Sequence, residues 1–454
     1  MKTNLKASFE PVSSKEWKQK IQYELDGADF ATTMVWNSPE DIQVKPFYHQ
    51  DEKVSKYPIK TNASGFKICQ KIFVFDLEKS IKRANNAVER GADCIRFSIE
   101  NEKTDVIYLL KNIVDKRSLI FLDLNFISID FVKKVDTFAF ENQMQIWCNH
   151  DPIGHLAQEG NWIQTKEKDN FESLRNVLKV GKNIGTISIN VGLYQNAGAN
   201  MAQQIAYGLA HANEYFNQIN NINKRLVFEI SVGSNYFFEI AKLRAFRQLF
   251  KLIAQEYGHE LDCFLMITPS KRNKTIFDYN VNMLRSTTEC MSAILGGADA
   301  ISNLAYDAIF HKDNEFGDRI SRNQLLILKN ESYFDKVNNP ADGSYYIENL
   351  TKQLSEKALK LFKDIETGGG FLKLLHQGII KKKISESAQK EQDLFDNGKL
   401  ILVGTNKYAN KNDLMKDELE LFPFVKIKAR KTLITPIIEK RLAEKWEQSR
   451  LLDS

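Results

Sequence analysis

The sequence predicts an α/β fold in which eight parallel strands close into a (β/α)8 TIM barrel. Eight short runs of β-branched and aromatic residues lie between positions 68 and 304, and segments with helical periodicity separate them. Almost continuously apolar runs are typical of strands that are buried on both faces of a parallel sheet. Eight strand–helix alternations over about 240 residues match a closed barrel, and no G-x-G-x-x-G motif favours an open doubly wound sheet.

Each predicted strand coincides with one apolar run. Between the runs, residues such as Phe246, Phe250 and Ile253 recur at helical spacing with basic residues among them. Gly91 and Gly297 each precede an Ala-Asp pair and a strand, so each is expected to end a helix in the left-handed conformation. In chain order, the strands are expected at residues 68–75, 94–99, 119–124, 144–149, 186–190, 226–231, 263–268 and 300–304.

Two further segments flank the barrel, which we place at residues 66–330. Residues 1–65 are predicted to form an N-terminal arm whose first helix is capped by Ser14, and residues 331–454 a C-terminal helical extension of the barrel domain. The aromatic residues of the arm could pack on the chain's own barrel or cover a partner chain. These residues are Trp17, Tyr23, Phe30, Trp36, Phe47 and Tyr48.

The composition is that of a soluble folded protein. The chain has 454 residues, is 43% hydrophobic and carries a formal net charge of +5, which is too weak a bias to favour nucleic acid. No apolar run is long enough to span a membrane, and no apolar stretch follows Met1–Leu5 as in a secretory signal. We therefore expect a cytoplasmic protein that binds neither membrane nor nucleic acid.

Cysteine and histidine spacing gives little support for a metal site. The five cysteines lack C-x-x-C spacing and mostly lie in apolar runs, so neither a disulfide framework nor structural zinc is expected. Cys148, His150 and His155 could together bind a metal, but no H-E-x-x-H motif or paired cysteine accompanies them. A solvated loop histidine is the ordinary reading.

Polar residues near the carboxyl ends of the strands, where barrel enzymes hold their chemistry, share no single theme. Lys71 or Lys271 could form a Schiff base, although a solvated or ion-paired lysine is the simpler interpretation. Asp123 and Glu229 could form a carboxylate pair for glycoside chemistry. The other candidates are Asp76, Glu100, Asn149, Asp151, Gln195, Asn196, Ser231, Thr268 and Asn303.

A longer pattern at residues 186–199, T-I-S-I-N-V-G-L-Y-Q-N-A-G-A, resembles the fifth-strand motif of the methylmalonyl-CoA mutase family. Three later segments are similar to family motifs: F-F-E-I-A-K-L-R-A at 237–245, N-P-A-D-G-S-Y-Y at 339–346 and V-G-T-N-K-Y at 403–408. Segments within residues 26–48 resemble the start of the family's small subunit. The similarity covers nearly the whole chain, with the motifs in family order.

The resemblance implies a barrel that encloses a coenzyme A thioester. It also implies a flavodoxin-like domain that holds adenosylcobalamin through the histidine of a D-x-H-x-x-G motif. None of the seven histidines of this chain stands in such a motif. We therefore expect no flavodoxin-like cobalamin domain in this chain, and no cofactor bound by it.

The family's site positions are changed in this sequence. By the resemblance, the histidine that hydrogen-bonds the thioester carbonyl falls at Leu193, and the tyrosine that shields the radicals falls at Lys71. The segment M-I-T-P-S-K at 266–271 lacks the family's histidine and glutamine, and the arginine that meets the substrate carboxylate falls near Glu159. The positions of the degenerate site are Lys71, Glu159, Leu193, Gln195, Asn196 and Lys271.

These changes lead us to expect a non-catalytic small subunit of a heterodimeric methylmalonyl-CoA mutase. Its partner would be the large catalytic subunit, which would carry adenosylcobalamin and interconvert methylmalonyl-CoA and succinyl-CoA. Two alternatives stay open. The barrel could still bind an acyl-CoA or a regulator, or it could be a repurposed lysine-dependent enzyme that uses Lys71 or Lys271 on another carbonyl substrate.

Overall fold

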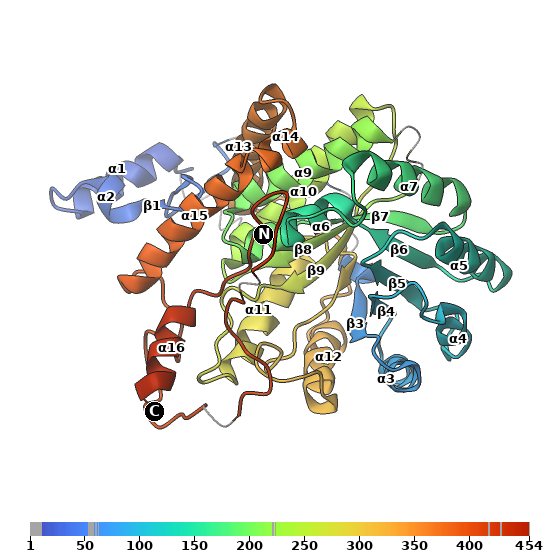
Figure 1. Cartoon of the computed structure of the whole chain (residues 1–454). Coiled ribbons are helices and arrows are strands. Elements are labelled where there is room, and N and C mark those ends of the chain that lie inside the picture. The colour runs from blue at the N-terminus through green and yellow to red at the C-terminus, as the bar shows by residue number, and fades with distance from the viewer. Residues whose placement is uncertain are drawn as a thin grey trace, which may run out of the picture.

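In the computed structural model, eight parallel strands close into a barrel in the order β10-β3-β4-β5-β6-β7-β8-β9 (Figure 1). The structure describes residues 11–52, 59, 61, 63–219, 222, 224–415, 418–426 and 429–453. The predicted barrel is confirmed. Its strands are β3 (Lys67–Phe73), β4 (Cys94–Ile99), β5 (Leu119–Leu124), β6 (Ile146–His150), β7 (Gly185–Asn190), β8 (Val227–Val232), β9 (Phe264–Pro269) and β10 (Ala300–Ile301).

Helices surround the barrel and form most of the segments that flank it. The barrel helices are α3 (Leu77–Glu89), α4 (Val106–Lys111), α5 (Ile129–Glu141), α6 (Pro152–Glu159), α7 (Glu167–Val180), α8 (Gly192–Asn196), α9 (Met201–Gln218), α10 (Tyr236–Glu256), α11 (Val281–Leu295) and α12 (Glu315–Asn330). The flanking helices are α1 (Ser14–Glu24), α2 (Phe30–Met34), α13 (Tyr345–Thr367), α14 (Phe371–His376), α15 (Ile379–Asp396) and α16 (Glu444–Asp453).

The last strand is shorter than its apolar run predicts. β10 ends at Ile301, whereas residues 300–304 were predicted, because the Asn303 side chain turns away from the sheet and bonds to Ser321 and Gln324 of α12. Gly91 and Gly297 have φ of 95° and 87°, as their places before β4 and β10 predicted. A side chain at Gly297 would lie 2.5 Å from Thr61, so glycine is needed there for space as well.

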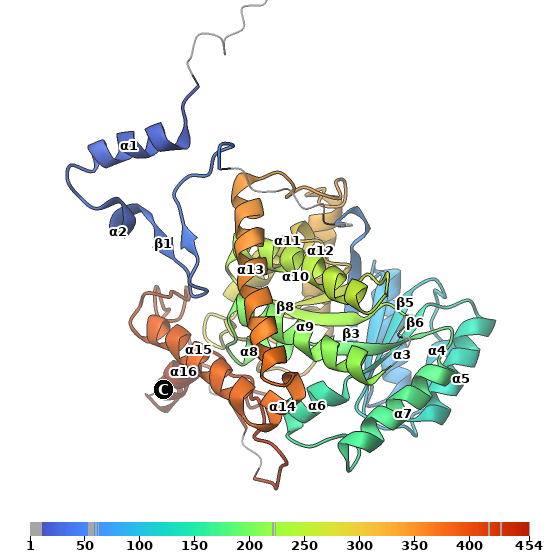
Figure 2. The same cartoon turned by 90° about the horizontal axis from the view of Figure 1, so that it is seen from above.

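Two of the segments that resemble family motifs lock together in the structure. Arg244 of α10 is fully buried, and its guanidinium pairs with Asp342 and, at 2.8 Å, with Glu348 at the start of α13. The Gly343 N–H also donates to Glu348 at 3.0 Å. These contacts hold α13 across α9 and α10 on the outer face of the barrel (Figure 2).

The first part of the N-terminal arm stands away from the barrel (Figure 2). Helix α1 is capped by Ser13 rather than by Ser14, because Ser13 is extended and exchanges hydrogen bonds with Glu16 in a capping box. Neither α1 nor α2 contains a buried residue. The Trp17 ring instead packs on Phe47 of the same arm at 4.5 Å.

The second part of the arm, residues 36–48, is attached to the barrel, and we call it the strap. Ile42 is completely buried in the main core cluster. Trp36 packs edge-on against Phe238 of α10 at 5.7 Å, and Tyr48 packs on Tyr346 of α13 at 5.1 Å. The aromatic residues of the arm therefore divide. Trp36 and Tyr48 pack on the chain's own barrel, whereas Phe47 and Trp17 pack on each other within the arm.

The C-terminal extension contains the helices α13 to α16 and also a long segment that is not helical. Among the described residues between α15 and α16 there is no helix. Residues 429–443, which we call the covering segment, instead run over the face where the carboxyl ends of the strands lie. Backbone N–H groups of Ile437, Lys440 and Leu442 donate to carbonyls of α6, of α8 and of the loop after β9.

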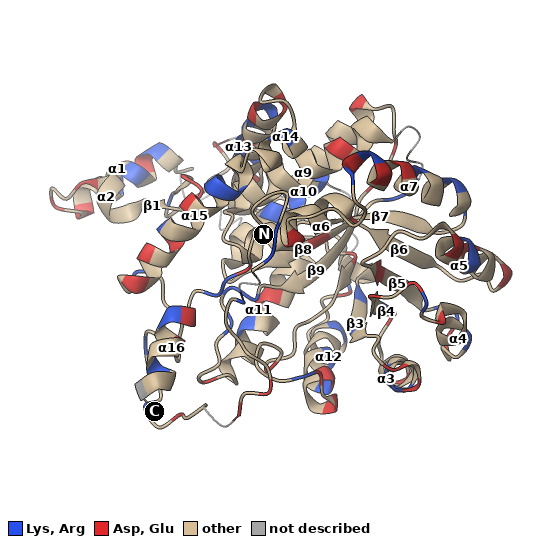
Figure 3. Ribbon diagram, viewed as in Figure 1, with Lys and Arg blue, Asp and Glu red and all other residues tan. Residues whose placement is uncertain are grey.

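The charged residues of the outer helices are of mixed sign. Lys and Arg residues are interspersed with Asp and Glu along α3, α5, α7 and α12 (Figure 3).

All five cysteines are buried and unpaired. Within the described residues, no helix combines the length and apolarity needed to cross a membrane. The first ten residues, where a secretory signal was sought, lie outside the described part of the chain.

Candidate functional site

The barrel mouth, meaning the face formed by the carboxyl ends of the strands, holds a compact group of charged side chains. Arg96 of β4 lies at its centre, with its Nε 2.6 Å from the Asp123 carboxylate of β5. The same guanidinium pairs with Glu229 of β8. Asn149 of β6 donates to Asp123 at 2.9 Å, and Lys71 of β3 faces the group. We call these five residues the mouth cluster.

The charges of the mouth cluster shift one another's titration. The positive charge of Arg96, followed by burial, lowers the pKa of Lys71, although Lys71 remains accessible to water. Burial raises the pKa of Glu229 despite its pairing with Arg96. Because Asp123 and Glu229 both pair with Arg96, neither is a free carboxylate. This arrangement does not resemble the acid and nucleophile of a glycosidase, where both carboxyl groups face the substrate.

Below the mouth cluster, the barrel bore is packed with side chains. Phe121, Trp147 and Phe264 stack on one another with ring centroids 5.1 to 5.9 Å apart. Gly185 of β7 makes room for this stack, because a side chain there would lie 2.1 Å from the Trp147 ring. The same cluster includes inward-facing residues of the other strands, namely Cys69, Cys94, Val227, Met266 and Ala300. The bore is therefore a packed core like that of other TIM barrels.

Three of the degenerate site positions lie in the short helix α8, next to the mouth. Leu193 is 1% exposed and packs in the main hydrophobic cluster. Gln195 accepts a hydrogen bond from the Ser270 hydroxyl at 2.9 Å, and Asn196 accepts one from the Lys271 N–H at 2.9 Å. These contacts join the loops that follow β7 and β9.

The covering segment contributes ion pairs at the same edge of the mouth. Glu439 lies 3.4 Å from the Lys271 ammonium and accepts from Asn196 at 3.3 Å. Glu159, at the far end of α6, pairs with Arg430 at 2.5 Å and does not join the mouth cluster. The family resemblance places an arginine near position 159, where this chain has glutamate. Because Glu159 pairs with Arg430, it does not present an unpaired negative charge.

The residues considered as metal ligands have separate partners. Cys148 packs in the core outside the bore, and burial raises the pKa of its thiol. Burial lowers the pKa of His150 to about 4, and its Nδ1 faces the carbonyls of Cys148 and Thr186. His155 bonds to the carbonyl of Asn161. In the part of the chain that the structure describes, no cluster of metal-ligating side chains occurs.

The other strand-end candidates do not gather into one site. Asp76 caps α3, and Asn303 is held by α12. Asp151 belongs instead to a buried polar chain that the sequence analysis missed. His211 lies 2.9 Å from Asp151 and 2.9 Å from the Tyr194 hydroxyl, while Tyr215 donates to Asp151 at 2.7 Å. These buried hydrogen bonds connect α9 to the loops after β6 and β7.

Arg96 is the central residue that sequence reasoning missed. It stands third in the run C-I-R-F-S-I, where a single charged residue interrupts an apolar strand. Side chains alternate across a strand, so a charge in a strand buried on both faces must meet opposite charges. That signal could have indicated a buried ion pair, but not which carboxylates supply it.

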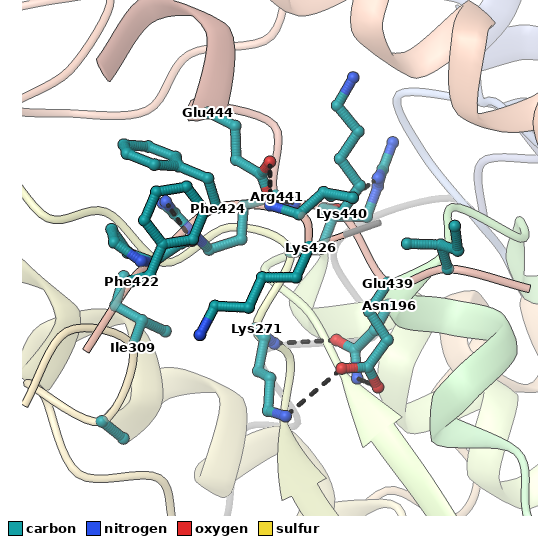
Figure 4. Close-up of a pocket in the computed structure, with 15 residues that line it drawn as sticks. Asn196, Lys271, Ile309, Phe422, Phe424, Lys426, Glu439, Lys440, Arg441 and Glu444 are labelled. Atoms are coloured by element: carbon teal, nitrogen blue, oxygen red, sulfur yellow. Dashed lines mark hydrogen bonds and ion pairs between the residues drawn. The ribbon is translucent and has the colours of Figure 1, made fainter. Parts of the chain in front are cut away.

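Beside the mouth, the covering segment, residues 422–426 and the loops after β7, β9 and β10 line a partly open cavity of about 360 Å³ (Figure 4). Its lining combines apolar, aromatic and charged side chains. Phe422 and Phe424 lie on one side, and Lys271 with Glu439 on the other (Figure 4). The charged lining residues are Lys271, Arg272, Lys426, Glu439, Lys440, Arg441 and Glu444.

Five of the seven histidines have places in this structure that differ from the cobalt ligand that the family resemblance implies. His150 and His211 are completely buried, and His155 and His311 bond to backbone carbonyls. His49 belongs to the arm, where it lies 3.0 Å from Asp51. Each of these five histidines is therefore buried or engaged within the chain.

Comparison with known proteins gives a consistent family. The family model described as methylmalonyl-CoA mutase matches residues 136–449. A methylmalonyl-CoA mutase small subunit of Porphyromonas gingivalis is 30% identical, over 92% of this chain and 73% of that protein.

Relatives described as methylmalonyl-CoA mutase, without mention of a subunit, align over a shorter stretch. Those of Rhizobium meliloti and Escherichia coli are 36% and 34% identical over 52% of this chain. In both cases the aligned part spans 35% of the relative's length. The similarity to these longer proteins therefore concerns about a third of each.

Proposed function

Because the chain belongs to the methylmalonyl-CoA mutase family, we propose that it is the non-catalytic small subunit of a two-chain methylmalonyl-CoA mutase. In this proposal the larger partner holds adenosylcobalamin and interconverts methylmalonyl-CoA and succinyl-CoA. The present chain completes and stabilises the complex without handling the substrate.

The packed barrel bore is the observation that carries the proposal. A barrel that encloses a coenzyme A thioester needs space along its axis, whereas here Phe121, Trp147 and Phe264 stack across the bore. Above them, Arg96 and its two carboxylates fill the mouth with a mutually paired ion cluster. Displacing either layer would break close packing or leave charges unpaired, and both are costly. The bore therefore favours a structural role over the alternative in which it binds acyl-CoA.

Leu193 supports the same proposal. By family resemblance this position holds the histidine that donates to the thioester carbonyl, and leucine has no donor. Its side chain is also 1% exposed within the apolar core. At this position the hydrogen-bond donor is therefore missing. The side chain also packs in the apolar core and does not face the bore.

The first part of the arm supplies a surface suited to a partner chain. Helices α1 and α2 have no buried residue, yet they carry Trp17, Ile21, Phe30 and Met34. These four side chains are only partly covered by the chain itself, and apolar side chains left partly exposed in this way are typical of subunit interfaces. We therefore assign α1 and α2 to the contact with the larger subunit.

Reconstitution with a larger mutase subunit tests the proposal. The two chains, expressed together, should co-elute as a one-to-one complex that forms succinyl-CoA, while this chain alone should be inactive. Failure to bind any larger mutase subunit, or turnover by this chain alone, would reject the proposal.

Lys71 gives a second candidate function. A lysine amine with a lowered pKa that water can reach is suited to attack a carbonyl, forming a carbinolamine that loses water to an imine. Lys271 is less suited to this attack, because its half-exposed ammonium pairs with Glu439. Borohydride reduction in the presence of pyruvate separates the two functions. Preferential labelling of Lys71 over the surface lysines, lost in Lys71→Arg, would favour the lysine-dependent enzyme.

A further inference from the structure

A second cavity lies at the seam where the barrel closes, beside β3 and between the first and last barrel helices, α3 and α12 (Figure 1). At this seam β10 pairs with β3 through two residues, Ala300 and Ile301, whereas β3 and β4 share five residue pairs. The cavity has a volume of about 180 Å³, which suits a small ion rather than the organic ligands that occupy roughly 300–1,000 Å³.

The cavity lining carries four cations and three carboxylates, so one bound negative charge would make it neutral. All three carboxylates are already paired with arginines of α3. The ion pairs are Arg83–Asp313 at 3.3 Å, Arg83–Asp318 at 2.8 Å and Arg90–Glu315 at 3.3 Å. The other two lining cations, Lys82 and Arg322, form no ion pair with any residue that the structure describes.

Arg322 of α12 is the buried one of these two cations. It is 6% exposed, and its Nη1 donates to the Gln70 side-chain oxygen at 3.0 Å, but its Nε–H has no hydrogen-bond partner within the described chain. Burial lowers the pKa of the guanidinium, and the nearby Asp318 and Glu315, which oppose that shift, are bonded to other arginines. Because a buried cation without a counterion is costly, Arg322 favours a bound anion.

Asn86 of α3 supplies an acceptor in the same cavity. Its Oδ1 is buried and has no hydrogen-bond partner among the described residues. Helix α12 also begins in the lining, at its N-cap Asn314, and the start of a helix carries partial positive charge. A small oxyanion that keeps a hydroxyl group can accept from Arg322 and donate to Asn86, whereas chloride and fully ionised sulfate have no proton to donate.

We propose that this cavity binds a small oxyanion with a hydroxyl group between Arg322 of α12 and Asn86 of α3. Bicarbonate and hydrogen phosphate share this chemistry. The bound ion connects the first and last helices of the barrel and so strengthens its closure between β3 and β10. The site lies outside the bore and does not depend on the role of the chain as a subunit.

Thermal unfolding of the full chain at neutral pH and constant ionic strength, with bicarbonate, phosphate, sulfate or chloride, tests the proposal. Bicarbonate or phosphate should raise the melting temperature progressively with concentration, because a ligand that binds only the folded chain stabilises it by mass action. Sulfate and chloride should not. Calorimetric titration with the stabilising ion should show one-to-one binding.

Two variants locate the ion. Arg322→Gln, which keeps a donor for Gln70, should weaken binding about tenfold or more, because a hydrogen bond from a charged group is lost. Asn86→Ala, on the other helix, should weaken it about threefold to tenfold. Arg319→Gln is the matched control, because Arg319 is exposed on α12 outside the lining, and it should bind the ion as the parent does. A thermal scan without added anion verifies that each variant folds.

Three results would overturn the proposal. They are the absence of binding by both bicarbonate and phosphate, an equal effect of sulfate or chloride, and affinity that survives either Arg322→Gln or Asn86→Ala. Binding of bicarbonate without phosphate, or of phosphate without bicarbonate, supports the proposal and identifies which of the two ions occupies the site.

Discussion

Arg96 determines the electrostatics of the barrel mouth. It is 5% exposed and bonds two carboxylates on different strands, so it joins β5 to β8 through the barrel interior. The buried Arg96 cation offsets both anions, whereas its loss would leave two partly buried carboxylates facing each other. The residue is therefore more important for holding the mouth together than for any reaction there.

Replacing Arg96 by methionine should destabilise the chain by about 3–5 kcal/mol, because Asp123 and Glu229 would lose the guanidinium that pairs with both of them. The loss should be smaller at acid pH, where both carboxylates can take up protons. Urea unfolding at several pH values measures it. Arg117→Ala is the control, since the Arg117 side chain is 92% exposed in its pair with Asp115 and should contribute about 0–1 kcal/mol. An Arg96→Met loss no larger than the control would mean that the mouth cluster is not structural.

The strap shows how one short element attaches the arm to the barrel. Glu40 in the strap is 7% exposed and accepts the Met201 N–H at 3.3 Å. Burial raises the pKa of its carboxyl, and Glu239 nearby raises it further. The folded strap therefore favours the protonated acid, and its ionisation opposes docking.

This pKa shift predicts a pH dependence of strap docking. A carboxyl whose pKa is raised on folding contributes stability that is present below its unfolded pKa of about 4.5 and is lost as pH rises through the folded value. Glu40→Gln, which keeps an oxygen for the Met201 N–H, should slow hydrogen exchange across residues 36–48 at pH 7. At pH 4 the variant and the parent should exchange alike. Slower exchange in the variant at both pH values would instead indicate an effect unrelated to titration.

The two parts of the arm should respond differently to mutation. Deleting residues 1–34 removes α1 and α2, which contain no buried residue and make no contact with the main core cluster, so the melting temperature should stay the same. Association with the larger subunit, followed by sedimentation, should weaken. Ile42→Ala in the strap is the contrasting variant, because Ile42 is fully buried and its truncation should cost about 2–5 kcal/mol of stability. If the deletion leaves association unchanged, the arm does not contact the partner.

At the scale of the whole molecule, the barrel was predictable and its covering was not. The strands were found within two residues at either end, apart from β10, because double-sided burial forces an apolar run at each strand. The covering segment lies on the mouth through backbone hydrogen bonds of Ile437, Lys440 and Leu442, which leave no pattern in the side chains. For the same reason the cavity beside the mouth could not be foreseen, since distant segments enclose it.

The site was partly predictable for similar reasons. Lys71, Asp123, Asn149 and Glu229 were identified as strand-end candidates, and the structure brings all four together around Arg96. Their grouping depends on the direction in which each strand's side chains face, which a single sequence leaves open. The packing of Phe121, Trp147 and Phe264 in the bore was not foreseen, because apolar residues on either face of a strand look alike in sequence.

The most direct test is the rate of succinyl-CoA formation from methylmalonyl-CoA in three samples. They are this chain alone, its complex with a larger mutase subunit, and the same complex in which the larger subunit's own carbonyl-binding histidine is replaced. If this barrel is a non-catalytic partner, only the intact complex turns over, and the disabled complex falls to the background rate. Turnover well above background in the disabled complex, or by this chain alone, would show that the barrel performs the chemistry itself.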